Sequence, residues 1–236
     1  MAVAVITGAS RGLGRALARA LAAEGWTLVL DARGARDLAG LERELGGAVT
    51  ALPGDVADPA HRAALVAAAD RLGGLDLLVN NAGVLGAEPL RPLAEHPPQG
   101  LRQALEVNVV APLALIQAAL PLLRAAAGAV LNISSDAAVE PYPTWGGYGA
   151  SKAALEQLSA VLALEQPELR VWWVDPGDMR TAMYAAAVPD DPEQQQRPLP
   201  EQAAVPALVA LLNGKHPSGR YTTAELLAAA GQLGAR

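Results

Sequence analysis

Three polar residues, Ser135, Tyr148 and Lys152, have the types and the spacing that proton transfer needs. Tyr148 and Lys152 lie four residues apart at the start of a predicted helix, so both side chains point to one side. An ammonium there would stabilise tyrosinate and lower the pKa of the phenol from about 10 toward neutral pH, where it exchanges protons usefully. Ser135 ends a predicted strand, and its hydroxyl could polarise a carbonyl oxygen. A Tyr–Lys pair on a helix is also common on ordinary protein surfaces.

A glycine-rich turn, Thr7–Gly14, lies between a predicted strand and a predicted helix. Glycines permit a tight turn and a close backbone approach, and the helix amino terminus directs N–H groups and a positive dipole at a phosphate. The Gly-x3-Gly-x-Gly spacing departs from the general dinucleotide fingerprint, and the lysine of a P-loop is missing. Nucleotide hydrolysis is therefore disfavoured, and a plain turn is the alternative to phosphate binding.

The elements that would position these residues alternate between strand and helix. Strands are expected over Val3–Ile6, Trp26–Leu30, Ala48–Leu52, Leu75–Val79, Ala129–Ile133 and Val171–Val174. Helices are expected over Gly12–Glu24, Asp37–Leu45, Pro59–Leu72, Gly100–Ala126 (interrupted by Pro112) and Gly149–Leu164. Short apolar strands separated by helices indicate βαβ units and a parallel sheet covered on both faces. We expect one α/β domain over residues 1–236, a Rossmann-like, doubly wound and mostly parallel sheet of about seven strands flanked by helices.

One segment, Ala185–Pro200, breaks this alternation. It contains four prolines and no periodicity, so it cannot be a strand or a regular helix throughout. In a doubly wound fold, a long loop after a late strand lies at the carboxyl edge of the sheet, where ligands bind. A substrate loop at about 185–200 is therefore expected, with a surface loop as the alternative.

Composition and charge exclude several classes of protein. The chain has no cysteine and three histidines, which excludes disulfide frameworks, thiolate zinc sites and cysteine nucleophiles, and no metal site is expected. The apolar runs are broken by Arg, Glu, Gly and Pro, so no membrane span is expected. A net charge of −6 without a basic run argues against nucleic acid as a partner. The amino terminus enters a strand directly, without the pattern of a signal peptide, and a cytoplasmic location is expected.

Five motifs in order give the chain a resemblance to the short-chain dehydrogenase/reductase (SDR) family over about residues 3–182. The motifs are Thr7–Gly14, Asn80–Gly83, Asn108, Asn132–Ser135 followed by Tyr148–Lys152 at the family's interval, and Pro176-Gly177 followed by Thr181. The resemblance implies an oxidoreductase that acts on CH–OH groups with NAD(P).

The roles of individual residues follow from this resemblance. Tyr148 would be the general acid in reduction and the general base in oxidation. Lys152 would lower its pKa and hold the cofactor ribose, Ser135 would hydrogen-bond the substrate oxygen, and Asn108 would position Lys152 through a water. Contacts to the cofactor are implied for Gly8, Ser10, Arg11, Gly12, Leu13, Gly14, Arg33, Asp55, Val56, Asn81, Ala82, Gly83, Tyr148, Lys152, Pro176, Gly177, Met179 and Thr181.

Cofactor preference depends on the end of the second predicted strand. NAD enzymes of the family place an acid at the position that is Ala32 here, whereas Asp31 lies one residue earlier and should face the other way. Arg33 follows, and Arg11 in the glycine turn is a second basic residue that favours a 2′-phosphate. We expect NADP(H) to be favoured over NAD(H), with Asp31 as the residue that could reverse this preference.

The substrate site has few sequence markers. Tyr142 and Trp145, next to the catalytic tyrosine, are either pocket walls or loop packing. Asp175 replaces the small residue usual in the family and adds a charge near the cleft, with no mechanism assigned to it. His61, at the start of a helix, is expected to lie in solvent.

The sequence therefore predicts an NADP(H)-dependent carbonyl reductase or secondary alcohol dehydrogenase with a small or medium uncharged substrate. The alternative is an NADP(H)-binding sensor or scaffold protein of the same fold without significant turnover. The chain ends in Ser218–Thr222 and a predicted helix over Glu225–Leu233, where many SDR members have a strand and a Gly-Gly pair that support a tetramer. A homodimer through the long helices is expected, with a homotetramer as the alternative.

Overall fold

The computed structural model describes the backbone of residues 1–233 and the side chains of residues 1–229, so the last three residues of the predicted domain lie outside it. Seven strands form one sheet in the order β3-β2-β1-β4-β5-β6-β7, and every neighbouring pair is parallel. The strands are β1 (Val3–Ile6), β2 (Thr27–Ala32), β3 (Val49–Pro53), β4 (Leu77–Asn80), β5 (Ala129–Ile133), β6 (Arg170–Asp175) and β7 (Gly219–Thr222). The predicted doubly wound sheet is confirmed, and it is parallel throughout.

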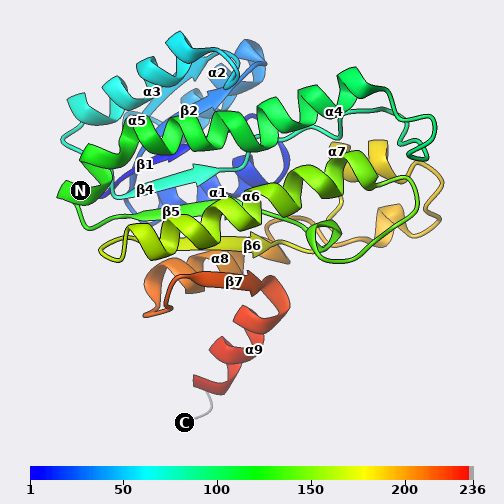
Figure 1. Ribbon diagram of the computed structural model, residues 1–236. Helices are drawn as coiled ribbons and strands as arrows, with labels where there is room; N and C mark the ends of the chain where they lie inside the picture. Colours follow the sequence, from blue (N-terminus) through cyan, green and yellow to red (C-terminus); the bar gives the residue numbers. More distant parts are fainter. Residues whose placement is uncertain (234–236) are drawn as a thin grey trace.

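Helices cover both faces of the sheet (Figure 1). One face carries α3 (Pro59–Arg71), α4 (Pro98–Leu105), α5 (Ala111–Ala125) and α6 (Gly146–Glu165). The other face carries α1 (Gly12–Ala23), α2 (Ala35–Leu45) and α8 (Ala204–Asn213), and α9 (Thr223–Leu233) packs on α8. The short helix α7 (Ala182–Ala187) follows β6.

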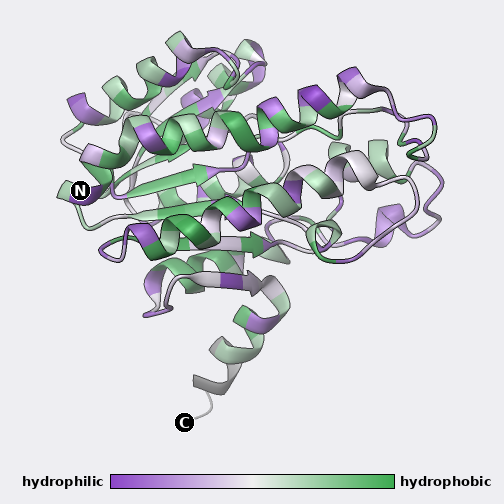
Figure 2. Ribbon diagram, viewed as in Figure 1, coloured by the Kyte–Doolittle hydropathy of each residue, from purple (hydrophilic) through white to green (hydrophobic). Residues whose placement is uncertain are grey.

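Alternation along the strands separates two apolar cores. In β2, Leu28 and Leu30 belong to the core under α1, whereas Val29 belongs to the core under α3. The same period of two continues to the strand end, where Ala32 joins the first core and Asp31 turns toward α3. Figure 2 shows the strands of the sheet mostly in green, between helices that carry both green and purple segments.

The long helical region differs from its prediction. It consists of α4 and α5 joined by a π-helical turn, Glu106–Val110. The helix continues through Pro112, and the predicted interruption is limited to the π-helical turn directly before it, because Pro112 has no N–H to donate to the preceding turn. The whole run Pro98–Ala125 is long and apolar enough to cross a membrane by length and composition alone, but Leu115 and Leu123 pack it against the sheet as part of a helical layer.

Among the strands, β7 is the one without an individual prediction, and the helices α7 and α8 were not predicted either. The β7 sequence Gly-Arg-Tyr-Thr has no apolar alternation. The segment forms the edge strand because it pairs with β6 in parallel register, from Trp172 with Gly219 to Asp175 with Thr222. The predicted carboxyl-terminal helix is present as α9.

The strand order places a topological switch point between β1 and β4. The chain builds outward from β1 through β2 to β3 on one side, and from β4 through β5 and β6 to β7 on the other. In such sheets the crevice for a ligand lies at the carboxyl ends of the strands, where the two halves diverge. The fold therefore directs attention to the turns that follow β1, β4, β5 and β6.

Candidate active site

A cleft of about 440 Å³ runs along this carboxyl edge. Most of the predicted site residues line it, namely Gly8, Ser10, Arg11, Gly12, Leu13, Arg33, Asp55, Val56, Asn81, Ala82, Gly83, Ser135, Tyr148, Lys152, Pro176, Gly177, Met179 and Thr181. Gly14 and Asn108 are the two predicted site residues that are not part of its wall. The sheet thus brings together segments more than 170 residues apart in the chain.

The glycine turn after β1 is packed too tightly for side chains. Gly8 has a φ of +68°, and a Cβ at this residue would lie 2.9 Å from the Cα of Ala82. A Cβ at Gly14 would lie 2.6 Å from the carbonyl oxygen of Gly8. The hydroxyl of Thr7 accepts the N–H groups of Asn81 and Ala82, each at 3.0 Å. The turn is therefore held against the end of β4 with its backbone open to the cleft, which fits the close approach of a pyrophosphate.

The carboxylate of Asp31 ties three segments together beside this turn. Its Oδ1 accepts the N–H of Gly8 at 2.8 Å, and its Oδ2 lies 3.0 Å from Nε2 of His61 in α3. The hydrogen bond to Asp31 raises the pKa of His61. The expectation that His61 lies in solvent was wrong, since its side chain is 9% exposed and faces the end of β2. Both oxygens of Asp31 are engaged, and the residue is 1% exposed.

Two arginines stand at the same end of the cleft. Arg11 and Arg33 are exposed, line the cleft, and have no hydrogen-bond or ion-pair partner within the part of the chain that the structure describes. Guanidinium groups bind phosphates with directed, bidentate hydrogen bonds. This end of the cleft can therefore hold a second phosphate in addition to the one at the glycine turn.

The other end of the cleft brings Ser135, Tyr148 and Lys152 together. The ammonium nitrogen of Lys152 lies 5.5 Å from the centroid of the Tyr148 ring and donates to the carbonyl of Ile133 at 2.6 Å. Trp145 packs edge-on against Tyr148, with ring centroids 5.7 Å apart. The hydroxyl of Ser135 donates to Oδ1 of Asp136 at 2.9 Å. One wall of this end is thus aromatic, and its floor carries the three polar groups.

The electrostatics of this end differ from the expectation based on spacing. Burial raises the pKa of Tyr148, the hydroxyl of Ser135 partly offsets this, and the charges of Asp136 and Asp175 raise the pKa further. Burial also lowers the pKa of Lys152 to about 8. The predicted lowering of the tyrosine pKa was therefore wrong for the protein alone, because desolvation outweighs the neighbouring cation. Tyr148 is a neutral phenol at working pH and holds a proton to donate.

Asn108 lies behind the wall, in the π-helical turn. Its Nδ2 donates to the carbonyl of Val84 and to Oγ of Ser151, and its Oδ1 accepts the N–H of Val84, all at 2.9 Å. Each polar atom of the amide is used, and the residue is 1% exposed. Asn108 therefore ties the segment after β4 to α6 one residue before Lys152, without a hydrogen bond to Lys152 itself. Single π-turns of this kind occur often at functional sites.

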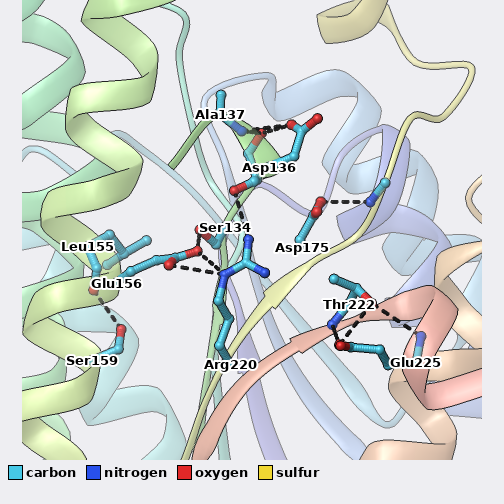
Figure 3. A network of polar contacts seen from close by, with 12 residues as sticks. Ser134, Asp136, Ala137, Leu155, Glu156, Ser159, Asp175, Arg220, Thr222 and Glu225 are labelled. Atoms are coloured by element: carbon cyan, nitrogen blue, oxygen red, sulfur yellow. Dashed lines mark hydrogen bonds and ion pairs between the residues drawn. The ribbon is translucent and has the colours of Figure 1, made fainter. Parts of the chain in front are cut away.

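A polar network on the far side of Ser135 connects β5, α6 and β7 (Figure 3). The hydroxyl of Ser134 donates to Glu156 at 2.6 Å, and Nε of Arg220 donates to Glu156 at 3.0 Å. The Arg220 guanidinium also reaches the carbonyl of Ser135 at 3.4 Å. Sequence reasoning missed Glu156 and Arg220, and no spacing rule relates a residue on a helix to one 64 positions later on a strand.

The wall nearest the substrate end contains acids that the motifs did not mark. Asp136, Asp175 and Asp178 all line the cleft. Of the two aromatic residues considered as pocket walls, Trp145 lines the cleft, whereas Tyr142 lies outside it and donates to Oδ2 of Asp136 at 3.0 Å. Of these three acids, only Asp175 was singled out from the sequence, because the family usually has a small residue there.

The segment after β6 closes the site through α7. Within the predicted substrate loop, only Ala187 lines the cleft, and the lining residues begin earlier, at Asp175. The other residues of this loop lie outside the cleft, and some of them contact α7. The hydroxyl of Tyr184 donates to Asp191 at 2.7 Å, and Arg197 pairs with Asp191 at 3.1 Å and with Asp178 at 3.3 Å.

Comparison with known proteins gives a consistent set of similarities. The sequence pattern of the family described as short chain dehydrogenase matches residues 2–192. L-fucose dehydrogenase of Oryctolagus cuniculus is 37% identical over 196 residues, covering 80% of this chain and 67% of the relative. Sepiapterin reductase of Meriones unguiculatus is 37% identical over 214 residues, covering 83% and 82%. The alcohol dehydrogenase from the archaeon Thermococcus sibiricus, complexed with 5-hydroxy-NADP, superposes with a TM-score of 0.84 at 30% identity, covering 94% of this chain and 95% of that one.

Proposed function

The chain belongs to the short-chain dehydrogenase/reductase family and is an oxidoreductase that acts on CH–OH groups with NAD(P); on that premise, we propose that it is an NADP(H)-dependent carbonyl reductase or secondary alcohol dehydrogenase. The observation that carries this proposal is the convergence of Ser135, Tyr148 and Lys152 at one end of a cleft whose other end is built for phosphates. The motifs give only the positions of these residues along the chain, whereas in the fold the three residues line the same end of one cleft.

The residues of the cleft fit a dinucleotide cofactor. Gly8 and Gly14 allow the turn after β1 to pack closely, since a Cβ at either residue would clash with protein atoms, and the turn lines the cleft where the pyrophosphate would approach. Asp55 and Val56 line the cleft beyond β3, on the side where the adenine would lie. Lys152 also lines the cleft and would hold the ribose beside the nicotinamide. When bound, NADPH supplies the hydride that reduces the carbonyl carbon.

Tyr148 supplies the proton in this proposal. In reduction, hydride adds to the carbonyl carbon, the carbon–oxygen double bond becomes a single bond, and the Tyr148 hydroxyl donates its proton to the oxygen. In oxidation the same steps run in reverse, so Tyr148 must first lose its own proton; as the phenolate, it takes the hydroxyl proton while hydride leaves the same carbon. Ser135 hydrogen-bonds the substrate oxygen and orients it toward Tyr148. The raised pKa of Tyr148 keeps the donor protonated before reduction begins.

The geometry at the end of β2 supports NADP(H) over NAD(H). An acid that selects NAD must direct a free carboxylate oxygen at the ribose 2′-hydroxyl. Asp31 lines the cleft, but each of its oxygens already has a protein partner, Gly8 or His61, so a ribose hydroxyl would have to share an oxygen with one of them. Arg11 and Arg33 offer guanidinium groups in the region where the 2′-phosphate would lie. The relative complexed with 5-hydroxy-NADP adds a family precedent for this cofactor class.

The substrate is placed between Trp145 and the segment that carries α7. Met183 and Ala187 of α7 and the ring of Trp145 provide its apolar lining. The segment over about 185–200 acts in this proposal as the brace that holds α7 over the substrate, through the Tyr184–Asp191–Arg197 contacts.

A panel of ketones, aldehydes and secondary alcohols, monitored by the absorbance of the reduced nicotinamide, tests the proposal. We expect turnover with NADPH or NADP⁺ and a clear advantage over NADH or NAD⁺. NADPH binding without turnover across the panel would instead favour the hypothesis of an NADP(H)-binding sensor. A preference for NADH would contradict the assignment of Arg11 and Arg33.

A further inference from the structure

The charges that line the cleft are unevenly distributed, and this distribution identifies the substrate class of the proposed oxidoreductase. The cofactor end carries charges of both signs, since Arg11 and Arg33 line it together with Asp31, Asp37 and Asp55. The reacting end carries Asp136 and Asp175, and the cation among its lining residues is Lys152. A cleft with low-dielectric walls concentrates the field of such charges and selects ligands of the opposite sign.

Asp175 is the most constrained of these acids. It ends β6 and is 9% exposed. Its Oδ1 accepts the N–H of Gly177 at 3.0 Å, and its other oxygen has no hydrogen-bond partner within the described residues (Figure 3). Burial raises the pKa of Asp175, and the charges of Asp136 and Glu156 raise it further, while the N–H of Gly177 and the charge of Arg220 offset part of this rise. A carboxylate in this position has no ion-pair partner in the protein, and a positively charged ligand in the cleft could supply one.

Asp136 has neutral partners only. Its Oδ1 accepts the hydroxyl of Ser135 at 2.9 Å and the N–H of Ala137 at 2.8 Å, and its Oδ2 accepts the hydroxyl of Tyr142 at 3.0 Å. These donors orient the carboxylate without neutralising it. The group lies directly beside the serine expected to hold the substrate oxygen.

The basic residues near this end are already paired. Arg220 forms an ion pair with Glu156 at 3.0 Å, and Arg197 is shared between Asp178 and Asp191. The Lys152 ammonium donates to the carbonyl of Ile133. These pairs account for Asp178 and leave Asp136 and Asp175 as two carboxylates without a cationic partner among the described residues.

We propose that the substrate carries a positively charged group, such as a protonated amine, close to the carbon that exchanges hydride, and that Asp175 and Asp136 bind this group. The inference rests on the proposed function and replaces the expectation of an uncharged substrate. It also gives a role to Asp175, where the family usually has a small residue. A cation between the two carboxylates would let the Ser135 hydroxyl turn from Asp136 to the substrate oxygen.

A matched pair of alcohols tests the charge directly. The probes are 2-amino-1-phenylethanol and 1-phenylpropan-1-ol, which differ by an ammonium in place of a methyl group beside the carbinol carbon. Oxidation with NADP⁺ at neutral pH gives kcat/KM for each probe. We expect the amine to be preferred, and Asp175→Asn to reduce the ratio of the two kcat/KM values by roughly 10- to 100-fold, the range for one hydrogen bond between charged groups. Asp136→Asn should reduce the same ratio.

Asp190→Asn is the matched control, since Asp190 is exposed in the segment after α7 and does not line the cleft. It should leave the ratio unchanged. Equal kcat/KM values for the two alcohols in the native protein, or a ratio that neither cleft variant changes, would overturn the inference while leaving the proposed function intact. If neither alcohol is oxidised, calorimetric titration of both into the protein–NADPH complex decides the matter. Tighter binding of the amine would sustain the charge site although the assigned activity fails, and equal binding would overturn it.

Discussion

Asp31 and Arg33 are two residues apart at the end of one strand, and their surroundings give them different roles. The pleat directs Asp31 toward α3, where Gly8 and His61 occupy both of its oxygens. Arg33 lies beyond the end of β2 and reaches the cleft as a free guanidinium. Sequence position alone could not distinguish a carboxylate that selects NAD from one that braces the glycine turn, because the distinction depends on His61, thirty residues away.

Arg33→Ala tests the basis of cofactor preference. Removing the guanidinium should lower kcat/KM for NADPH by about 10- to 100-fold, since a hydrogen bond to a charged group contributes about 1.5–3 kcal/mol. The value for NADH should stay within a few-fold. Arg36→Ala, an exposed arginine on α2 outside the cleft wall, is the control and should change neither value. An equal loss with both cofactors would show that Arg33 does not contact the 2′-phosphate.

Lys152 predicts a pH dependence of cofactor binding. Burial lowers its pKa to about 8, so the ammonium is present below about pH 8 and is lost above it. Because the ammonium is proposed to hold the ribose hydroxyls, the Kd for NADPH should rise as pH increases through about 8, by roughly tenfold. Fluorescence titration of the native protein and of Lys152→Met checks this. The variant should bind NADPH weakly at every pH. If the Kd of the native protein changes with pH in the same way as that of the variant, the Lys152 ammonium does not hold the cofactor.

At the scale of the elements, the strands of the sheet follow directly from sequence patterns. Runs such as Val3–Ile6 and Ala129–Ile133 are continuous and apolar because both faces of a parallel sheet are buried, and the observed bounds agree with the predicted ones. The π-turn at Glu106–Val110 has no comparable pattern, since its extra residue per turn is decided by the contacts of Asn108. For the same reason β7 could not be predicted by itself, because a partly polar edge strand is defined by its neighbour.

Arg220→Met tests the link between β7 and α6. The ion pair with Glu156 is partly buried, with side-chain exposures of 28% and 12%. Removing the guanidinium leaves Glu156 with Ser134 as its remaining partner and should lower the free energy of unfolding by about 1–3 kcal/mol, less than for a fully buried pair. Urea unfolding measures this. Arg91→Met, which removes an exposed pair with Glu95, is the control and should have an effect within about 0.5 kcal/mol. Equal effects of the two substitutions would argue against a structural role for the network.

At the scale of the whole molecule, the site exists because the strand order places distant turns at one edge. The motif residues could be identified from the sequence because their spacing is short and local to each turn. The acids of the reacting end could not, because Asp136, in the turn after β5, and Asp175, at the end of β6, acquire their importance from lining the same cleft without a cationic hydrogen-bond partner among the described residues. The residues proposed to bind the cofactor can therefore largely be predicted from the sequence, whereas those proposed to bind the substrate are identified only in the folded structure.

Exposed apolar residues on the outer face of α5 and α6 predict that the protein forms a homodimer through these helices. Leu113 on α5 and Val161 and Leu164 on α6 are exposed apolar residues on the same side of the sheet. We expect light scattering to give twice the 24.2 kDa mass of the chain, and the double substitution Val161→Glu with Leu164→Glu to give the single-chain mass. Leu72→Glu, on an exposed apolar residue at the end of α3, should leave the dimer intact. A monomeric native protein would exclude this interface.

The central claim is that Tyr148 moves the proton in a cleft that binds NADP(H). Tyr148→Phe keeps the ring against Trp145 and removes only the hydroxyl, so packing and the cofactor region should be preserved. The decisive measurement is the turnover of native protein and Tyr148→Phe on the same carbonyl substrate, with the Kd for NADPH determined in parallel. The account predicts a loss of turnover of at least about 100-fold, the lower range for removal of a general acid, with a Kd within about threefold of the native value. Turnover by Tyr148→Phe close to that of the native protein would contradict it.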